Sequence, residues 1–269
     1  MPFADLLPAL PPAIPPATLA LLAAFAFAAG LVDAVVGGGG LIQVPAALVL
    51  LRGVPVLTIL GTGKTASLVG TSAAAVRYAR RVALPWRALL PAGLVAAGCS
   101  WVGARAVSLL NPMLLKPLLL GLLVALWGYT MAKPDLGAHH RPRFPPDRER
   151  WAVLAVAVAL GFYDGFFGPG TGSLLVFALV GWLGYDFLRA SASAKVIHVC
   201  TNLGGWFYFG FHHQVLWLAA VPMAAANLAG SLVGTRLALR GGTRVIRVFF
   251  LVIVAVLIGR LTGEVAGWW

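Results

Sequence analysis

Two aspartates and two lysines lie within or at the start of segments that are otherwise strongly apolar. Asp33 and Asp164 are the two of eight acidic residues that fall inside apolar spans, and Lys64 and Lys195, two of four lysines, head apolar segments. Charge inside a bilayer is costly, so such residues are usually functional or paired. Two structural roles are the alternatives. The aspartates could accept hydrogen bonds from an interrupted backbone, and the lysines could extend to the lipid headgroups.

Each lysine leads a stripe of polar side chains with helical spacing. Positions three and seven after the lysine continue each stripe: Lys64, Ser67 and Thr71 form one, and Lys195, His198 and Asn202 form the other. This spacing places each trio on one helix face, so the two stripes could converge on an anion. Hydrogen bonding between helices is the structural alternative. His198 has no metal partner visible in the sequence, so we expect no metal site, whereas proton coupling through His198 stays open.

Two glycine-rich runs, Gly37 to Gly40 and Gly168 to Gly172, follow the two aspartates and interrupt the apolar segments. Glycine permits tight turns and lets a ligand approach backbone N–H groups closely. In inverted-repeat transporters, broken segments of this kind direct half-helix N-termini at anions near the midplane. Close helix packing by small residues is the alternative. The predicted substrate-binding residues are Gly38, Gly39, Gly40, Gln43, Lys64, Thr71, Gly170, Thr171, Gly172, Ser173, Lys195, His198 and Asn202. We expect Asp33 and Asp164 to stabilise the turns or to take protons.

The composition indicates an all-α polytopic membrane protein. Of the 269 residues, 60% are hydrophobic and only 10% are charged, and apolar runs of about 20 residues, the length that crosses a bilayer, recur along the chain. The net charge of +12 comes from arginines in short connections, which is a topology signal. It does not indicate nucleic-acid binding, because no soluble basic surface is left over. Cys99 and Cys200 fall in apolar segments and are expected to be packing residues.

The second half of the chain repeats the first at one constant shift in numbering, the repeat offset, which carries Asp33 onto Asp164. The same offset superposes further residues that rarely match by chance: Lys64 on Lys195, Trp86 on Trp217 and Arg105 on Arg236. Corresponding loops carry opposite basic bias, because the connection at 77–87 is rich in arginine whereas its equivalent after Phe211 has none. We therefore predict an inverted repeat of about five plus five segments, with two glycine-broken re-entrant or short helical hairpins meeting near the midplane.

The predicted organisation follows from the repeat and the loop charges. We expect a proline-rich lead (1–16), a first transmembrane repeat (17–131), a cytoplasmic linker (132–149), a second, inverted repeat (150–262) and a short tail (263–269). Helical pieces in the first repeat are expected at 18–36, 41–51, 62–81, 88–109 and 112–131. Both termini are predicted to be periplasmic.

The stretch GLVDAVVGGGGLIQVPAALVLLRGVPVLTILGTGKTASLVGTSAAAVRYARR resembles the signature of the TauE/SafE family, and GFYDGFFGPGTGSLL resembles that family's degenerate second copy. The resemblance covers most of the chain through the duplication. It implies a bacterial cytoplasmic-membrane transporter of sulfite, sulfonates or similar small anions. The family commonly has Asn before the first lysine, where this chain has Gly63, so substrate preference could differ here.

We therefore expect a secondary transporter, in the export direction, for a small sulfur-containing anion, working by alternating access without a cofactor. An anion channel and a carrier of small carboxylates are the alternatives. An intramembrane enzyme using Asp164 and His198 is a third interpretation, which recovery of unchanged substrate would exclude. The expected partners are the anion and the lipid bilayer; the oligomeric state stays open.

Overall fold

The computed structural model describes residues 14–111, 113–114, 117–118, 120–121, 124–125 and 143–240. Within these residues the chain forms eight α-helices and no strands: α1 (Pro16–Val36), α2 (Gly40–Leu50), α3 (Val56–Ala79), α4 (Trp86–Ser108), α6 (Pro146–Phe166), α7 (Thr171–Gly181), α8 (Phe187–Phe211) and α9 (Trp217–Leu239). The segment expected at 112–131 lies mostly outside the described residues. The residues beyond Arg240, most of the proline-rich lead and the linker up to residue 142 lie outside them as well.

Prolines and one aspartate fix where the long helices begin. Pro15, Pro55 and Pro145 occupy the N-cap positions of α1, α3 and α6, where a missing backbone N–H costs nothing. Asp186 caps α8 by accepting a hydrogen bond from the backbone N–H of Arg189 at 2.8 Å, the usual role of Asp at this position. Helix α3 therefore starts at Val56, earlier than the expected 62, and α6 starts at Pro146, inside the expected linker.

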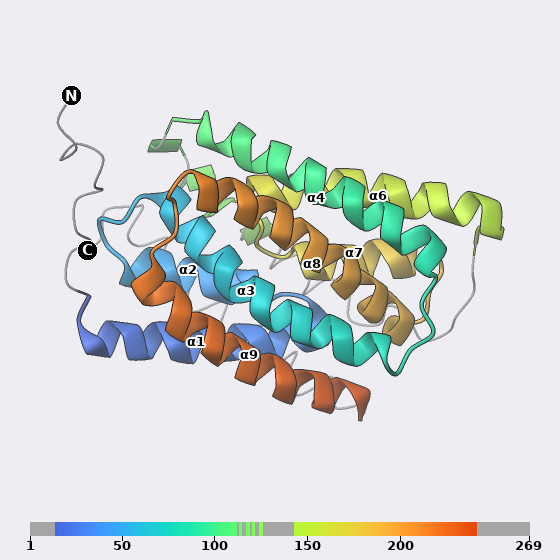
Figure 1. Ribbon diagram of the computed structural model, residues 1–269, viewed down its shortest axis with the longest axis horizontal. Helices are drawn as coiled ribbons and strands as arrows, with labels where there is room; N and C mark the ends of the chain where they lie inside the picture. Colours follow the sequence, from blue (N-terminus) through green and yellow to red (C-terminus); the bar gives the residue numbers. More distant parts are fainter. Residues whose placement is uncertain are drawn as a thin grey trace.

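The helices are arranged around a central pair. Helix α1 packs along α9 at one edge, α4 packs along α6 at the opposite edge, and α3 and α8 lie between them (Figure 1). The repeat offset relates α1 to α6 and α4 to α9, so the two edge pairs correspond to each other. Each edge pair is formed by one helix from each half of the chain, and the halves are therefore interleaved.

Glycines let the edge pairs approach to backbone contact. A Cβ atom added at Gly30 of α1 would lie 2.1 Å from the carbonyl oxygen of Asn227 in α9, and one added at Gly161 of α6 would lie 2.8 Å from that of Ala96 in α4. Two serine hydroxyls form hydrogen bonds that the repeat offset also relates to each other. Ser100 donates to the carbonyl of Thr201, and Ser231 donates to the carbonyl of Gly70. Each of these contacts between small residues therefore has a counterpart at the repeat-related positions.

The two short helices α2 and α7 follow the glycine runs. Helix α1 ends at Val36 and is capped by Gly37, which adopts a left-handed φ of 81°, and α7 begins after Gly170, with a φ of 80°. These conformations explain why glycine stands at both turns. The two turns contact each other, since a Cβ atom on Gly37 would lie 2.3 Å from the backbone carbon of Gly172. The turns of the two halves therefore meet inside the bundle.

Three described helices are long and apolar enough to cross a membrane by length and composition: α4, α9 and residues 16–35 of α1. The short helices α2 and α7 are also apolar. Helices α3 and α8, which carry the lysines and the polar stripes, lie at the centre. The apolar edge helices thus surround the two polar ones.

Candidate functional site

The aspartates and the lysines pair crosswise between the two halves. Lys64 of α3 forms an ion pair with Asp164 at the end of α6, and Lys195 of α8 forms one with Asp33 at the end of α1, at 2.8 Å. All four side chains are buried. Each pair joins one half of the chain to the other, and the repeat offset exchanges the two pairs. The charges are thus paired with each other, and neither lysine extends to the lipid headgroups.

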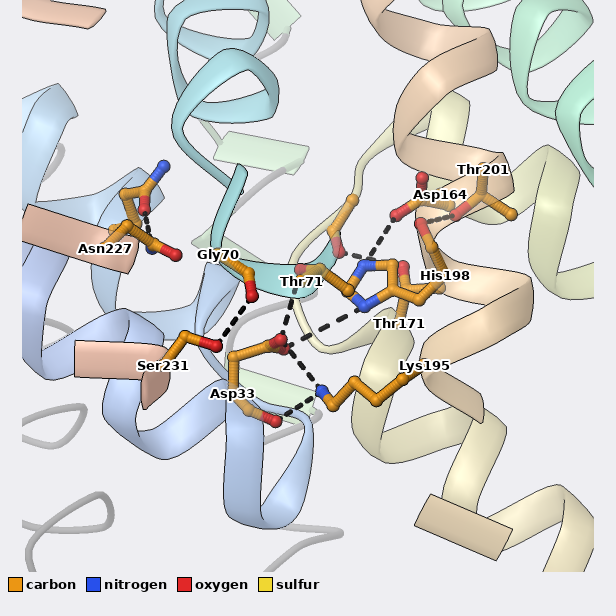
Figure 2. A network of polar contacts seen from close by, with 12 residues as sticks. Asp33, Gly70, Thr71, Asp164, Thr171, Lys195, His198, Thr201, Asn227 and Ser231 are labelled. Atoms are coloured by element: carbon orange, nitrogen blue, oxygen red, sulfur yellow. Dashed lines mark hydrogen bonds and ion pairs between the residues drawn. The ribbon is translucent and has the colours of Figure 1, made fainter. Parts of the chain in front are cut away.

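Further contacts hold each pair in place. Lys195 also donates to the backbone carbonyl of Asp33, and the Thr71 hydroxyl donates to the Asp33 carboxylate at 3.3 Å (Figure 2). The aliphatic stem of Lys64 lies against α8 at Gly205, where an added Cβ atom would come within 2.7 Å of the lysine Cε. The lysines therefore lie at the interface of the halves because small or polar neighbours leave room for them.

The imidazole of His198 lies between the two aspartates (Figure 2). Its Nδ1 is 3.9 Å from Asp33 Oδ1, and its Nε2 is 3.6 Å from Asp164 Oδ1. These two carboxylate oxygens and Nδ1 are buried without a hydrogen-bond partner among the described residues. His198 thus connects the two ion pairs without a direct hydrogen bond to either carboxylate.

A chain of amides borders the cluster. Gln43 of α2 donates to the carbonyl of Gly63 at 2.8 Å and accepts a hydrogen bond from Asn227 of α9 at 3.0 Å. The Asn202 side-chain nitrogen is buried and has no hydrogen-bond partner in the described part of the chain. The repeat did not point to Asn227, because its repeat-related position is Ala96. An amide within an apolar segment was the sole available clue.

A small cavity of about 30 Å³ adjoins the charge cluster, enough for one or two water molecules. Eight of the predicted residues line it: Asp33, Gly40, Gln43, Lys64, Asp164, Gly170, His198 and Asn202. The other predicted residues are not part of its lining: Gly38, Gly39, Thr71, Thr171, Gly172, Ser173 and Lys195. The sequence-based set did not include the remaining lining residues: Gly37, Val44, Leu60, Gly63, Ser67, Gly165, Phe167, Gly168 and Phe209.

The residues predicted to bind substrate but absent from the lining have structural contacts. Thr71 and Lys195 bind Asp33, and the Thr171 hydroxyl donates to the carbonyl of Gly168 at 2.8 Å. Gly39 packs against α1, where an added Cβ atom would lie 2.7 Å from the Cβ of Asp33. The two glycine turns thus pack largely against each other and against α1. No group of three His, Cys, Asp or Glu side chains in the described residues is arranged to hold a metal ion.

A bundle of apolar helices that buries two crosswise ion pairs beside broken helices has the architecture of a membrane transport protein. The chain belongs to the family described as Sulfite exporter TauE/SafE, which matches residues 22–261.

Similar proteins have names that indicate the same class. A "Probable membrane transporter protein ORF9" of Sinorhizobium sp. is 34% identical over 91% of this chain and 93% of its own. A "Probable membrane transporter protein" of Haemophilus influenzae is 33% identical over 85% of this chain and 88% of its own. "Probable membrane transporter protein YfcA" of Escherichia coli K12 is 30% identical over 92% and 91%. No solved structure matches the chain significantly. The family and the names indicate a membrane transporter and not an enzyme.

Proposed function

We propose that this protein is a secondary transporter of a small sulfur-containing anion, such as sulfite or a sulfonate, in the bacterial cytoplasmic membrane. The observation that carries the proposal is a cavity on one side of the charge cluster. Residues from both halves of the chain form this cluster. The family description supports a sulfur anion as substrate. The lining supports an anion because it combines Lys64 and His198 with the side-chain amides of Gln43 and Asn202, all of which can donate hydrogen bonds. Asp33 and Asp164 also line the cavity, and the charge of each is matched by a lysine.

The position of the cavity supports alternating access. Its lining includes Leu60, Gly63 and Lys64 from the first half of α3 and Phe209 near the end of α8. At the repeat-related positions are Ser191, Ala194, Lys195 and Tyr78, and none of them lines the cavity. In a two-fold related protein, a cavity that extends from the centre toward one side, as this one does, is expected for one of two alternating states.

The proposed topology gives the cavity a direction. The predicted inverted repeat places the beginning of α3 and the end of α8 on the periplasmic side, with the linker cytoplasmic. The structure supports their common location, since the backbone N–H of Leu216, just after α8, donates to the Thr62 hydroxyl of α3 at 2.9 Å. In this topology the cavity extends from the cluster toward the periplasm, and the second state has its cavity on the cytoplasmic side.

Counterflow in proteoliposomes tests the transport function. Radiolabelled sulfite outside the vesicles should enter with saturable kinetics, and unlabelled sulfite trapped inside should accelerate its entry. A channel would conduct without this acceleration, and a carboxylate carrier would respond to trapped acetate instead. Arg105→Gln, an exposed position at the end of α4, is the matched control. Labelled sulfite entry equal to that of empty liposomes would refute the proposal.

Thiol accessibility tests the alternation separately. Leu60→Cys and Ser191→Cys are placed singly in a background without the native cysteines, Cys99 and Cys200. Saturating sulfite should change the labelling rates of the two new cysteines in opposite directions. Changes in the same direction at both positions would contradict alternating access.

A further inference from the structure

One titratable side chain in the charge cluster has no counterpart in the other half. The repeat offset relates the two ion pairs to each other, but it relates His198 to Ser67. Both residues line the cavity, and only the histidine can gain or lose a proton near neutral pH. The cluster is therefore symmetric in its fixed charges and asymmetric in one titratable group.

The surroundings of the ring are suited to a second N–H donor. The two carboxylate oxygens nearest to the ring, Asp33 Oδ1 and Asp164 Oδ1, are buried and have no hydrogen-bond partner among the described residues. Neutral imidazole carries one N–H and can donate to only one of them, whereas imidazolium donates from both nitrogens. If each of the two carboxylate oxygens moved toward the ring by less than about 1 Å, both ring nitrogens would lie within hydrogen-bond distance of a carboxylate.

The other groups that face the ring determine the charge balance. Asp33 of α1 and Asp164 of α6 are each matched by a lysine, Lys195 on the histidine's own helix and Lys64 on α3. Two hydroxyls near the cluster do not titrate. Thr171 of α7 lies beside the ring (Figure 2), and Ser100 of α4, bound to the Thr201 carbonyl, lies near Gly205 and the stem of Lys64.

Two tyrosines complete the surroundings, Tyr78 buried and Tyr163 half-buried. Tyr78 and Tyr163 donate to the carbonyls of Ala34 and Pro169. The cluster thus has no net charge while the histidine is neutral, and a net charge of one when the histidine is protonated.

We propose that His198 takes up a proton when a monoanion binds beside it, so that proton and anion cross the membrane together. The inference rests on the proposed transport function and identifies its coupling ion. An anion entering a neutral, buried cluster would be an uncompensated charge, which is costly. A proton on His198 balances that charge. Each ligand therefore strengthens the binding of the other by the same factor.

The direct test counts protons released or taken up on binding. Purified protein in weakly buffered detergent solution is mixed with methanesulfonate, which stays a monoanion, while a pH indicator records proton uptake. The experiment is run at a pH at which the histidine is neutral in the anion-free protein. Under that condition the wild type should take up about one proton for each anion bound. Its affinity should fall by up to about tenfold for each pH unit in that range.

Two variants isolate the ring. His198→Gln keeps hydrogen-bonding groups but cannot titrate, so it should bind the anion more weakly, without proton uptake and with affinity that does not depend on pH. His212→Gln changes an exposed histidine after the end of α8 and should behave as the wild type.

The outcomes separate the two proposals. Wild-type binding without proton uptake overturns the coupling alone, and this measurement does not depend on folding of any variant. Proton uptake that persists in His198→Gln overturns the role of this residue. If neither methanesulfonate nor acetate binds the wild type between about pH 6 and 8, both the coupling and the proposed transport of such anions fail.

Discussion

Removing one member of a crosswise ion pair should strongly destabilise the protein. In Lys195→Met the charge is lost while an apolar side chain of similar length remains. The Lys195 ammonium lies 2.8 Å from the Asp33 carboxylate, and at an effective dielectric constant of about 20 this separation corresponds to about 6 kcal/mol of attraction. Part of this attraction offsets the desolvation of both charges. We therefore expect the variant to lose about 3–5 kcal/mol of unfolding free energy, because Asp33 is left buried without its lysine.

The double variant Asp33→Asn with Lys195→Met should lose much less than the sum of the single losses. It leaves no unpaired charge, so we expect a coupling energy of at least about 2 kcal/mol between the two positions. Unfolding in mixed micelles titrated with sodium dodecyl sulfate, followed by far-ultraviolet circular dichroism, measures all four members of the cycle. The single variant Arg105→Gln should stay within about 0.5 kcal/mol of the wild type.

Additivity would refute this interpretation. If the two single losses add to the double loss within about 0.5 kcal/mol, the positions are independent. The lysine would then contribute through something other than its contact with Asp33. The corresponding cycle on Lys64 and Asp164 should give coupling of the same sign, because the repeat makes the same contact twice.

Three further predictions concern the turns, the helix contacts and the topology. Gly37→Ala should destabilise the fold severely, because its Cβ atom would lie 2.3 Å from the backbone carbon of Gly172 in the first turn of α7. Gly98→Ala has open space and should stabilise α4 by about 0.5–1 kcal/mol in the same unfolding assay. Ser100→Ala and Ser231→Ala should each lose about 1 kcal/mol, and clearly unequal losses would show that the two hydrogen bonds are not equivalent. A reporter enzyme fused after Phe211 should be active in the periplasm, and cytoplasmic activity would contradict the proposed topology.

The breaks between helices could be predicted from the sequence because they depend on local chemistry. Gly37 and Gly170 adopt left-handed backbone conformations that other residues rarely adopt, and glycine runs in apolar segments indicate such turns. The start of α3 was predicted wrongly. The sequence pattern places residues 52–61 between two helical pieces, but Pro55 caps a helix that begins at Val56, so Leu57 to Leu60 already belong to it.

The partners of the buried charges could not be predicted in the same way. From the sequence, Asp33 could pair with Lys64 of its own half or with Lys195 of the other half, and both pairings keep the repeat intact. The choice depends on how the halves interleave, which no local pattern determines. Equal numbers of acidic and basic residues in apolar segments indicated pairing. From the sequence we assigned the lysines to the anion, and that role stays a prediction.

The crosswise arrangement restricts how the proposed alternation could occur. The repeat offset exchanges the two ion pairs, so in a two-fold related protein they lie on opposite sides of the axis and close to it. Rotation of the halves about an axis through the cluster displaces groups near it least, and groups farther along the helices move more. Separating the pairs would expose two buried charges at a cost of several kcal/mol each. We therefore expect both ion pairs to persist in the two states while the flanking positions exchange. Leu60 and Phe209 would leave the cavity lining, and Ser191 and Tyr78 would join it.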